Sequence, residues 1–287
     1  MNEAASVASA PPARRHFEPE DRIWVSAGLF AALALALGLP LVLLVLWSVA
    51  GRWPAPDLLP SSYTGAIWRA VLDDGDVLSA AVTSTVIAVL VTVLTALVAF
   101  PAAWAMAKFP LRCKRAVEVF VLAPVIVPGI VVAVGVGQVF LAWGLTYTVP
   151  GVVLVQMVGT LPLMIRLLVA SFETLPDELI HAARSLGASP LRAVWHVALP
   201  LCTPGLLAGA LLSFVGSFEE FDKTFLVGAP AVQTLPVLLY HHLDPYSLQF
   251  PLAAVVALIL LLPVLVVFVL SGRILRDDLM AAGMGKV

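Results

Sequence analysis

Long apolar runs separated by short polar segments dominate this chain. A helix that crosses a bilayer needs about 20 mostly apolar residues, and several runs reach that length. We therefore predict an all-α, polytopic membrane fold of about six transmembrane helices. The predicted spans cover residues 23–48, 79–105, 116–142, 149–172, 201–225 and 250–271.

The composition agrees with a membrane protein. Hydrophobic residues make up 61% of the 287 residues and charged residues only 12%, about half of the roughly 25% found in an average soluble domain. A soluble fold would have too little polar surface to cover so much apolar material, whereas a lipid bilayer removes that need. The net charge of −2 and the lack of a basic patch give no support for a nucleic-acid partner.

The charges between the spans predict the orientation. Most of the 16 lysines and arginines fall in the two tails, in the loop after the second span and between the fourth and fifth spans. The positive-inside rule then places both termini in the cytoplasm, as an even number of spans also requires. This divides the chain into a cytoplasmic tail (1–22), a membrane domain (23–272) and a second cytoplasmic tail (273–287).

Small residues and short turns predict how some spans pack. Gly205 and Gly209 are four residues apart in the fifth span, a spacing that favours close approach of a neighbouring helix. A short outer turn at 144–150 joins the third and fourth spans, which we expect to pack as an antiparallel pair.

The cytoplasmic segment at about 173–200 is more elaborate than a simple loop. Thr174 with Asp177 predicts the start of a short helix, Gly187 its end, and Ser189 the start of a second helix. Two short amphipathic helices that meet at a glycine have the form of a docking element for a cytoplasmic partner.

This segment resembles the EAA loop of permease subunits of ATP-binding-cassette importers. The family pattern is Glu-Ala-Ala, three residues, Gly, nine residues, then Ile-x-Leu-Pro, and every spacing recurs here. His181 replaces the glutamate, which puts in question any contact that needs a carboxylate there; Glu178 lies one turn earlier. Val197 replaces the isoleucine. The predicted coupling residues are His181, Ala182, Ala183, Gly187, Ser189, Leu199 and Pro200.

The resemblance implies a transport subunit rather than an enzyme. Its partners would be cytoplasmic ATPase subunits that bind ATP and magnesium, a second homologous permease, and a periplasmic or extracellular solute-binding protein. Its location would be the bacterial plasma (inner) membrane. The sequence has no Gly-x-x-x-x-Gly-Lys-Ser/Thr loop for ATP, and we expect no cofactor, metal or catalytic site in this chain.

Ionisable residues in the fifth predicted span mark a candidate substrate pathway, because charges inside a span are costly. Glu219 and Asp222 are predicted to share a helix face, and Glu219 to pair with Lys223. The acids either line the outer part of the pathway or lie at the outer interface, and the glutamines either line it or make packing hydrogen bonds. The predicted pathway residues are Glu219, Glu220, Asp222, Gln138 and Gln156.

The fifth span and its sequel, with Gly228-Ala229-Pro230 and Thr234-Leu235-Pro236, resemble permeases of spermidine/putrescine-type importers. The resemblance implies import of a polyamine-like or other small organic amine by alternating access. One alternative is an importer permease for another small solute or an inorganic ion. Another is a secondary transporter that needs no ATP.

Overall fold

The computed structural model describes residues 19–54, 56–243 and 249–284, and they are mostly helical. The predicted tail at 1–22 lies mostly outside these residues, and α12 continues to Met284, past the predicted span end at 271. The helices are α1 (Pro19–Val49), α2 (Ala66–Leu72), α3 (Gly75–Lys108), α4 (Lys114–Ile126), α5 (Gly129–Ala142), α6 (Val149–Glu173), α7 (Asp177–Ser185), α8 (Pro190–Ala193), α9 (Leu199–Phe218), α10 (Asp222–Gly228), α11 (Leu235–His242) and α12 (Phe250–Met284).

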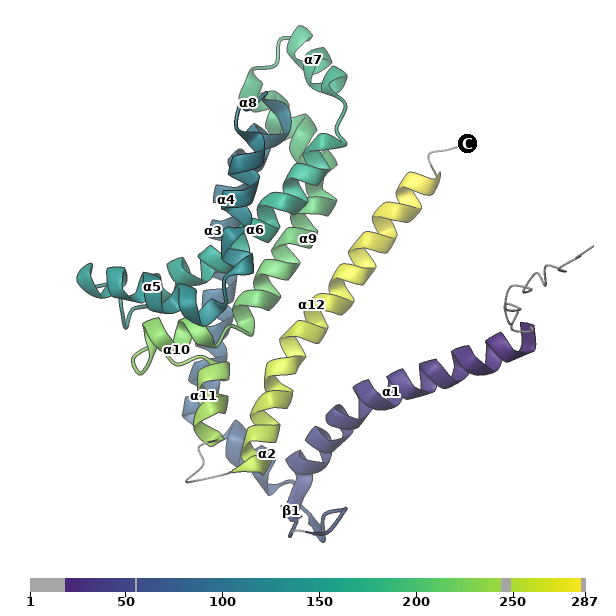
Figure 1. Cartoon of the computed structure of the whole chain (residues 1–287), viewed down its shortest axis with the longest axis vertical. Helices are drawn as coiled ribbons and strands as arrows, with labels where there is room; N and C mark the ends of the chain where they lie inside the picture. Colours follow the sequence, from purple (N-terminus) through teal and green to yellow (C-terminus); the bar gives the residue numbers. More distant parts are fainter. Residues whose placement is uncertain (1–18, 55, 244–248, 285–287) are drawn as a thin grey trace, which may run out of the picture.

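The predicted membrane fold is confirmed. Five described helices are long and apolar enough to cross a bilayer, or six if α4 and α5 form one bent span. The strands β1 (Ala50–Arg52) and β2 (Ser62–Tyr63) form a small antiparallel ribbon. This ribbon and α2 lie at one end of the bundle, the β1 end, and α7 and α8 lie at the opposite end, the α7 end (Figure 1).

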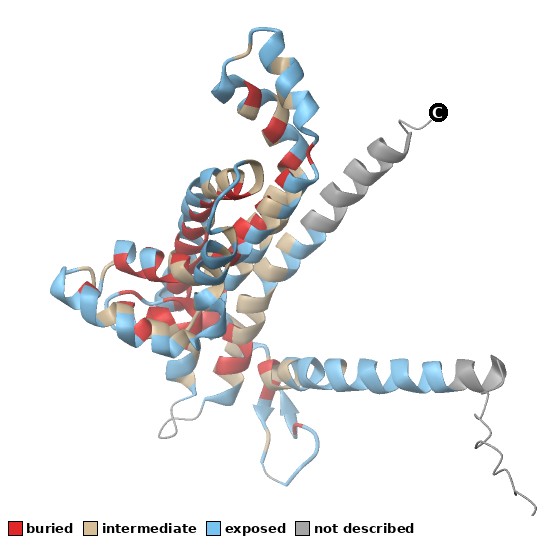
Figure 2. Ribbon diagram, turned by 45° about the horizontal axis from the view of Figure 1, so that its top comes forward, coloured by how far each residue is buried: buried red, intermediate tan, exposed pale blue. Residues whose placement is uncertain are grey.

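Helices α3, α6 and α9 contact one another and form the centre of the bundle. Phe172 of α6 is fully buried there, and the rings of Phe100 and Trp104 on α3 meet it edge-on, each with a centroid distance of 5.2 Å. Helix α12 contacts α9 beside this centre. Helix α1 contacts α12 and α2 but leans away from the bundle, and most of its described part is exposed (Figure 1 and Figure 2). Its apolar surface suits contact with lipid.

The two glycines of α9 bring it against α6. A Cβ on Gly205 would lie 1.8 Å from the Oγ and 2.8 Å from the Cβ of Ser171, and a Cβ on Gly209 would lie 2.3 Å from the Sδ of Met164. Larger residues would therefore separate the two helices. The predicted close packing at this glycine pair is confirmed.

The third predicted span is not one helix. Helix α4 ends at Ile126, Val127 is extended, and α5 starts after Pro128 at an angle of 101° to α4. The proline ring disfavours helical geometry at the residue before it, so the chain turns there. As a result α4 packs on α6, whereas α5 packs mainly on α10 and only its edge contacts α6. The predicted packing of the third span against the fourth therefore holds for α4 but not for α5.

The fifth predicted span is also interrupted. Helix α9 ends at Phe218, and α10 starts at Asp222 after a short break. At its other end α9 continues α8 through a π-helical turn at Val194–Ala198, and Pro200 lies in the first turn of α9, inside this continuous helical segment. The prediction of one helix over 201–225 is therefore wrong.

Candidate functional site

The two interrupted spans meet inside the bundle. Helix α10, which follows the break in the fifth span, packs against α5, which follows the break in the third, and against α6. Both short segments lie across the long helices, between the α7 end and the β1 end (Figure 1). Breaks inside a membrane bundle are tolerated where the freed backbone groups find partners, so these two breaks direct attention to the side chains around them.

A buried ion pair occupies this junction. The ammonium of Lys223 pairs with the carboxylate of Glu220, and the side chains are only 10% and 16% exposed. The same carboxylate accepts a hydrogen bond from the backbone N–H of Lys223 at 3.0 Å, which caps the start of α10. The Glu220 carboxylate therefore pairs with the buried ammonium and also accepts a hydrogen bond from a backbone N–H in the first turn of α10.

Two glycines lie beside the ammonium. A Cβ on Gly159 of α6 or on Gly129 of α5 would lie 3.5 Å from the Nζ of Lys223. The carboxylate of Asp222 also approaches Gly129, at 3.4 Å from the same Cβ position. An acid beside the first turn of a helix is favourable because the helix dipole is positive there. Asp222 and Lys223 thus bring α10 against the start of α5.

Hydrogen bonds extend this charged pair into a polar layer across the bundle. Gln156 of α6 is buried; its amide nitrogen donates to Thr224 at 2.7 Å, and its oxygen accepts from Ser217 at 2.5 Å. One turn further along α6, Thr160 shares a hydrogen bond of 3.0 Å with Thr95 of α3. We call this set the polar layer; its residues are Thr95, Gln156, Thr160, Ser217, Glu220, Asp222, Lys223 and Thr224.

The structure divides the predicted pathway residues. Gln156, Glu220 and Asp222 belong to the polar layer, whereas Gln138 on α5 and Glu219 at the end of α9 are exposed. The predicted shared face of Glu219 and Asp222 is wrong, because the helix ends between them. The predicted pairing of Glu219 with Lys223 is wrong for the same reason: the break turns Glu220 towards the ammonium instead.

Sequence reasoning missed the four hydroxyl residues of the polar layer and the two glycines beside it: Thr95, Thr160, Ser217, Thr224, Gly129 and Gly159. Hydroxyl residues and glycines are common in membrane helices for ordinary packing, so none is conspicuous alone. The spacing of Glu220 and Lys223 was the available signal, since residues three apart also face each other on a helix.

The loop at the α7 end has a defined backbone turn, a helix cap and an ion pair. Gly187 has φ +89°, a conformation that favours glycine, and it ends the turn after α7. The Ser189 hydroxyl accepts a hydrogen bond from the N–H of Arg192 at 3.3 Å and so caps α8. The Lys108 ammonium bonds Asp177 at 2.6 Å, and this hydrogen bond and charge lower the pKa of Asp177.

The predicted coupling residues are mostly accessible. His181, Ala182, Gly187, Ser189 and Pro200 are exposed, and Ala183 and Leu199 are half-buried. The predicted helix start at Thr174 is wrong: Thr174 ends α6, and α7 starts at Asp177 after Pro176. A shallow hollow of about 390 Å³ lies between α7, α8 and the π-helical turn, beside Gly187 and His196. The exposed apolar side chains at this end include Leu186, Leu191 and Trp195, which are 90%, 69% and 59% exposed.

Comparison with known proteins gives consistent matches. Residues 99–277 match the family described as binding-protein-dependent transport system inner membrane component. The chain is 27% identical over 202 residues to the sulfoquinovosyl glycerol transport system permease protein SmoH of Agrobacterium fabrum, covering 70% of this chain and 71% of that protein. It is 34% identical over 113 residues to the putative 2-aminoethylphosphonate transport system permease protein PhnU of Salmonella typhimurium, covering 39% of each.

A solved structure shares the fold. The crystal structure of a bacterial ABC transporter involved in the import of the acidic polysaccharide alginate aligns with a TM-score of 0.74 and 19% identity, over 91% of this chain and 99% of that chain. The two named relatives serve a sugar derivative and an aminophosphonate, so the similarity does not single out the spermidine/putrescine-type group. The family match, which covers more than half of the chain, establishes that this protein belongs to the binding-protein-dependent inner-membrane components and is a multi-pass permease subunit of an ABC importer, not an enzyme.

Proposed function

We propose that this permease imports a small solute that carries an amino group, and that the solute passes the polar layer on its way. The observation that supports this proposal is the charge at the junction of the interrupted spans. Two acids, Glu220 and Asp222, lie there beside the base Lys223, and a third, Glu219, is exposed at the adjoining end of α9. Because Lys223 neutralises only Glu220, a cationic group on the solute would be attracted to the remaining carboxylates.

We base the proposed orientation of the chain in the membrane on the distribution of its lysines and arginines. Lys108, Lys114 and Arg115 lie at the α7 end, and the positive-inside rule assigns that end and both termini to the cytoplasm. The β1 end then faces the solute-binding protein on the outside. A second homologous permease would complete the pathway beside this chain, as the family resemblance implies.

The α7 end is the proposed contact for the ATPase subunits. Leu186, Leu191 and Trp195 are exposed at the end of the bundle, beyond the long apolar helices that lipid would cover. Exposed apolar side chains outside the lipid-covered region indicate a protein partner. The capped turn at Gly187 and the anchor from Lys108 to Asp177 hold this surface rigid enough to transmit a movement of the ATPase to α9.

Reconstitution tests this proposal. The permease, its ATPase, its second permease and its binding protein would be placed in liposomes, and uptake of radiolabelled putrescine, 2-aminoethylphosphonate and trehalose measured with and without ATP. We expect ATP-dependent uptake of an amino compound, its loss in Gly187→Asp, and its retention in His181→Glu, which restores the family residue. Uptake of trehalose alone would refute the solute class, and uptake without ATP would refute the coupling.

A further inference from the structure

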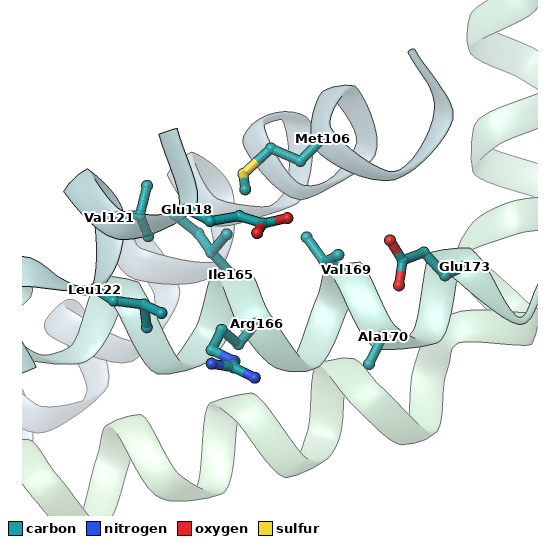
Figure 3. Close-up of a pocket in the computed structure, with 9 residues that line it drawn as sticks. All are labelled: Met106, Glu118, Val121, Leu122, Ile165, Arg166, Val169, Ala170 and Glu173. Atoms are coloured by element: carbon teal, nitrogen blue, oxygen red, sulfur yellow. The ribbon is translucent and has the colours of Figure 1, made fainter. Parts of the chain in front are cut away.

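A groove unrelated to the polar layer lies between α3, α4 and α6, towards the α7 end. Its volume is about 220 Å³. Apolar side chains such as Val121, Ile165 and Val169 form most of its lining, and three charged side chains, Glu118, Arg166 and Glu173, lie around them (Figure 3). An apolar floor with charges of both signs at its edge suits a ligand that is itself partly apolar and partly charged.

Arg166 is exposed and has no ion-pair partner among the described residues. It lies seven residues before the end of α6, about 10 Å inside that end at a rise of 1.5 Å per residue. Among the described residues no acid lies within 4 Å of it, and Glu173 is already bonded to Lys114 at 2.8 Å. A guanidinium inside a span is costly unless an anion or water meets it, and its planar fork suits a phosphate.

Glu118 provides the opposite charge on the facing helix. Its carboxylate points into the groove above Arg166 (Figure 3); its charge acts on Lys114, but no ion pair within 4 Å among the described residues includes it. One cation and one anion, neither of them in an ion pair within 4 Å among the described residues, therefore line the same groove. This arrangement matches a zwitterion with a phosphate and an ammonium group, whereas a ligand that is only anionic would leave Glu118 without a partner.

The surroundings indicate that the ligand is a lipid. The groove extends from Glu173, which pairs with Lys114 at the α7 end, about two helical turns inwards to Arg166, so its outer part lies at the depth of lipid headgroups in the proposed orientation. Helix α4 has no buried residue, and its apolar side chains Val119 and Phe120 are 62% and 80% exposed. Acyl chains could therefore extend from the groove along α4.

We propose that this groove binds the headgroup of phosphatidylethanolamine. Arg166 bonds the phosphate, Glu118 accepts hydrogen bonds from the primary ammonium, and the acyl chains cover α4. A phosphatidylglycerol headgroup offers no cation to Glu118, and the quaternary ammonium of phosphatidylcholine has no N–H to donate. Binding should therefore be selective for phosphatidylethanolamine over both.

Native mass spectrometry of the full-length chain in detergent, titrated with each of these three lipids, tests the proposal. We expect phosphatidylethanolamine to bind tightest, and Arg166→Gln and Glu118→Gln each to weaken it about tenfold or more, since each removes a charge-assisted contact. Arg166→Lys, which keeps the charge without the fork, should lose less. The controls Arg52→Gln and Glu178→Gln, which remove the same groups elsewhere, should bind as the parent does.

The other outcomes overturn the proposal. Equal binding of phosphatidylglycerol would mean that Glu118 does not contact the headgroup. Unchanged binding in Arg166→Gln and Glu118→Gln would place the lipid elsewhere. Soluble phosphoethanolamine that binds with the same dependence on both residues, in the absence of lipid, would identify a water-soluble zwitterion as the ligand instead.

Discussion

The buried pair of Glu220 and Lys223 gives the sharpest test of the structure. Lys223→Met would leave the carboxylate of Glu220 in a site with 16% exposure and no cation. Removing one partner of a buried ion pair costs about 3–5 kcal/mol. At about 2–4 °C per kcal/mol for a chain of this size, the melting temperature should fall by about 6–20 °C. The melting temperature of Glu220→Gln should fall by a similar amount, because this variant leaves the ammonium of Lys223 unpaired.

The double variant separates charge from packing. Glu220→Gln with Lys223→Met removes both charges, and the glutamine oxygen still accepts the N–H that caps α10. Replacing a buried ion pair with neutral groups is often neutral or stabilising, so the double variant should melt near the parent temperature. Melting would be followed by size-exclusion chromatography of heated, detergent-solubilised protein.

A matched control uses the exposed pair of Lys114 and Glu173, whose side chains are 38% and 49% exposed. Lys114→Met should leave the melting temperature almost unchanged, because solvent screens exposed pairs. The reasoning fails if Lys223→Met melts as the parent does, since the ammonium would then not be buried. It also fails if the double variant is as unstable as the single ones, since lost packing would then explain the effect.

Three further outcomes are expected. Gly205→Ala should destabilise the chain by about 1–3 kcal/mol, because its Cβ would lie 1.8 Å from the hydroxyl of a serine on α6. Gly216→Ala on the same helix places its Cβ in open space and should leave the melting temperature unchanged, so thermal melting of the two variants tests the prediction. Gly187→Ala should lower uptake without loss of membrane insertion, because φ +89° strains any L-residue by about 1–2 kcal/mol; unchanged uptake would argue against a rigid loop. Because the pKa of Asp177 is lowered, its ion pair with Lys108 is present above that pKa and is lost only as the pH falls through it. Uptake by Asp177→Asn, divided by uptake by the parent protein, should therefore be the same at about pH 6 and about pH 8.

Local patterns were sufficient to locate the loop at the α7 end. Gly187, Ser189 and Asp177 each have a backbone role that their residue type favours: a positive φ, a helix cap and a first-turn acid. Such signals act over a few residues and need no knowledge of neighbours. The role of the loop in contacting an ATPase remains a prediction, because it depends on a partner.

Local sequence patterns did not predict where the spans are interrupted. Pro101 and Pro162 remain inside α3 and α6, whereas Pro128 ends a helix. A membrane helix tolerates a proline when neighbours satisfy the freed groups, so the outcome depends on what packs there. The break around Glu220 contains no proline or glycine. There the Glu220 carboxylate accepts the hydrogen bond from the Lys223 N–H that caps α10.

The sequence by itself determined the class of protein, the approximate position of the apolar spans and the position of the loop at the α7 end, because bilayer thickness and helix rise translate directly into the length of apolar runs. Only the tertiary structure decided which helices break, which acid pairs with Lys223, and that Arg166 faces a groove with Glu118. Those outcomes depend on contacts between α4, α5, α6 and α10, residues far apart in the chain, and the energy of a buried charge depends on the groups that surround it.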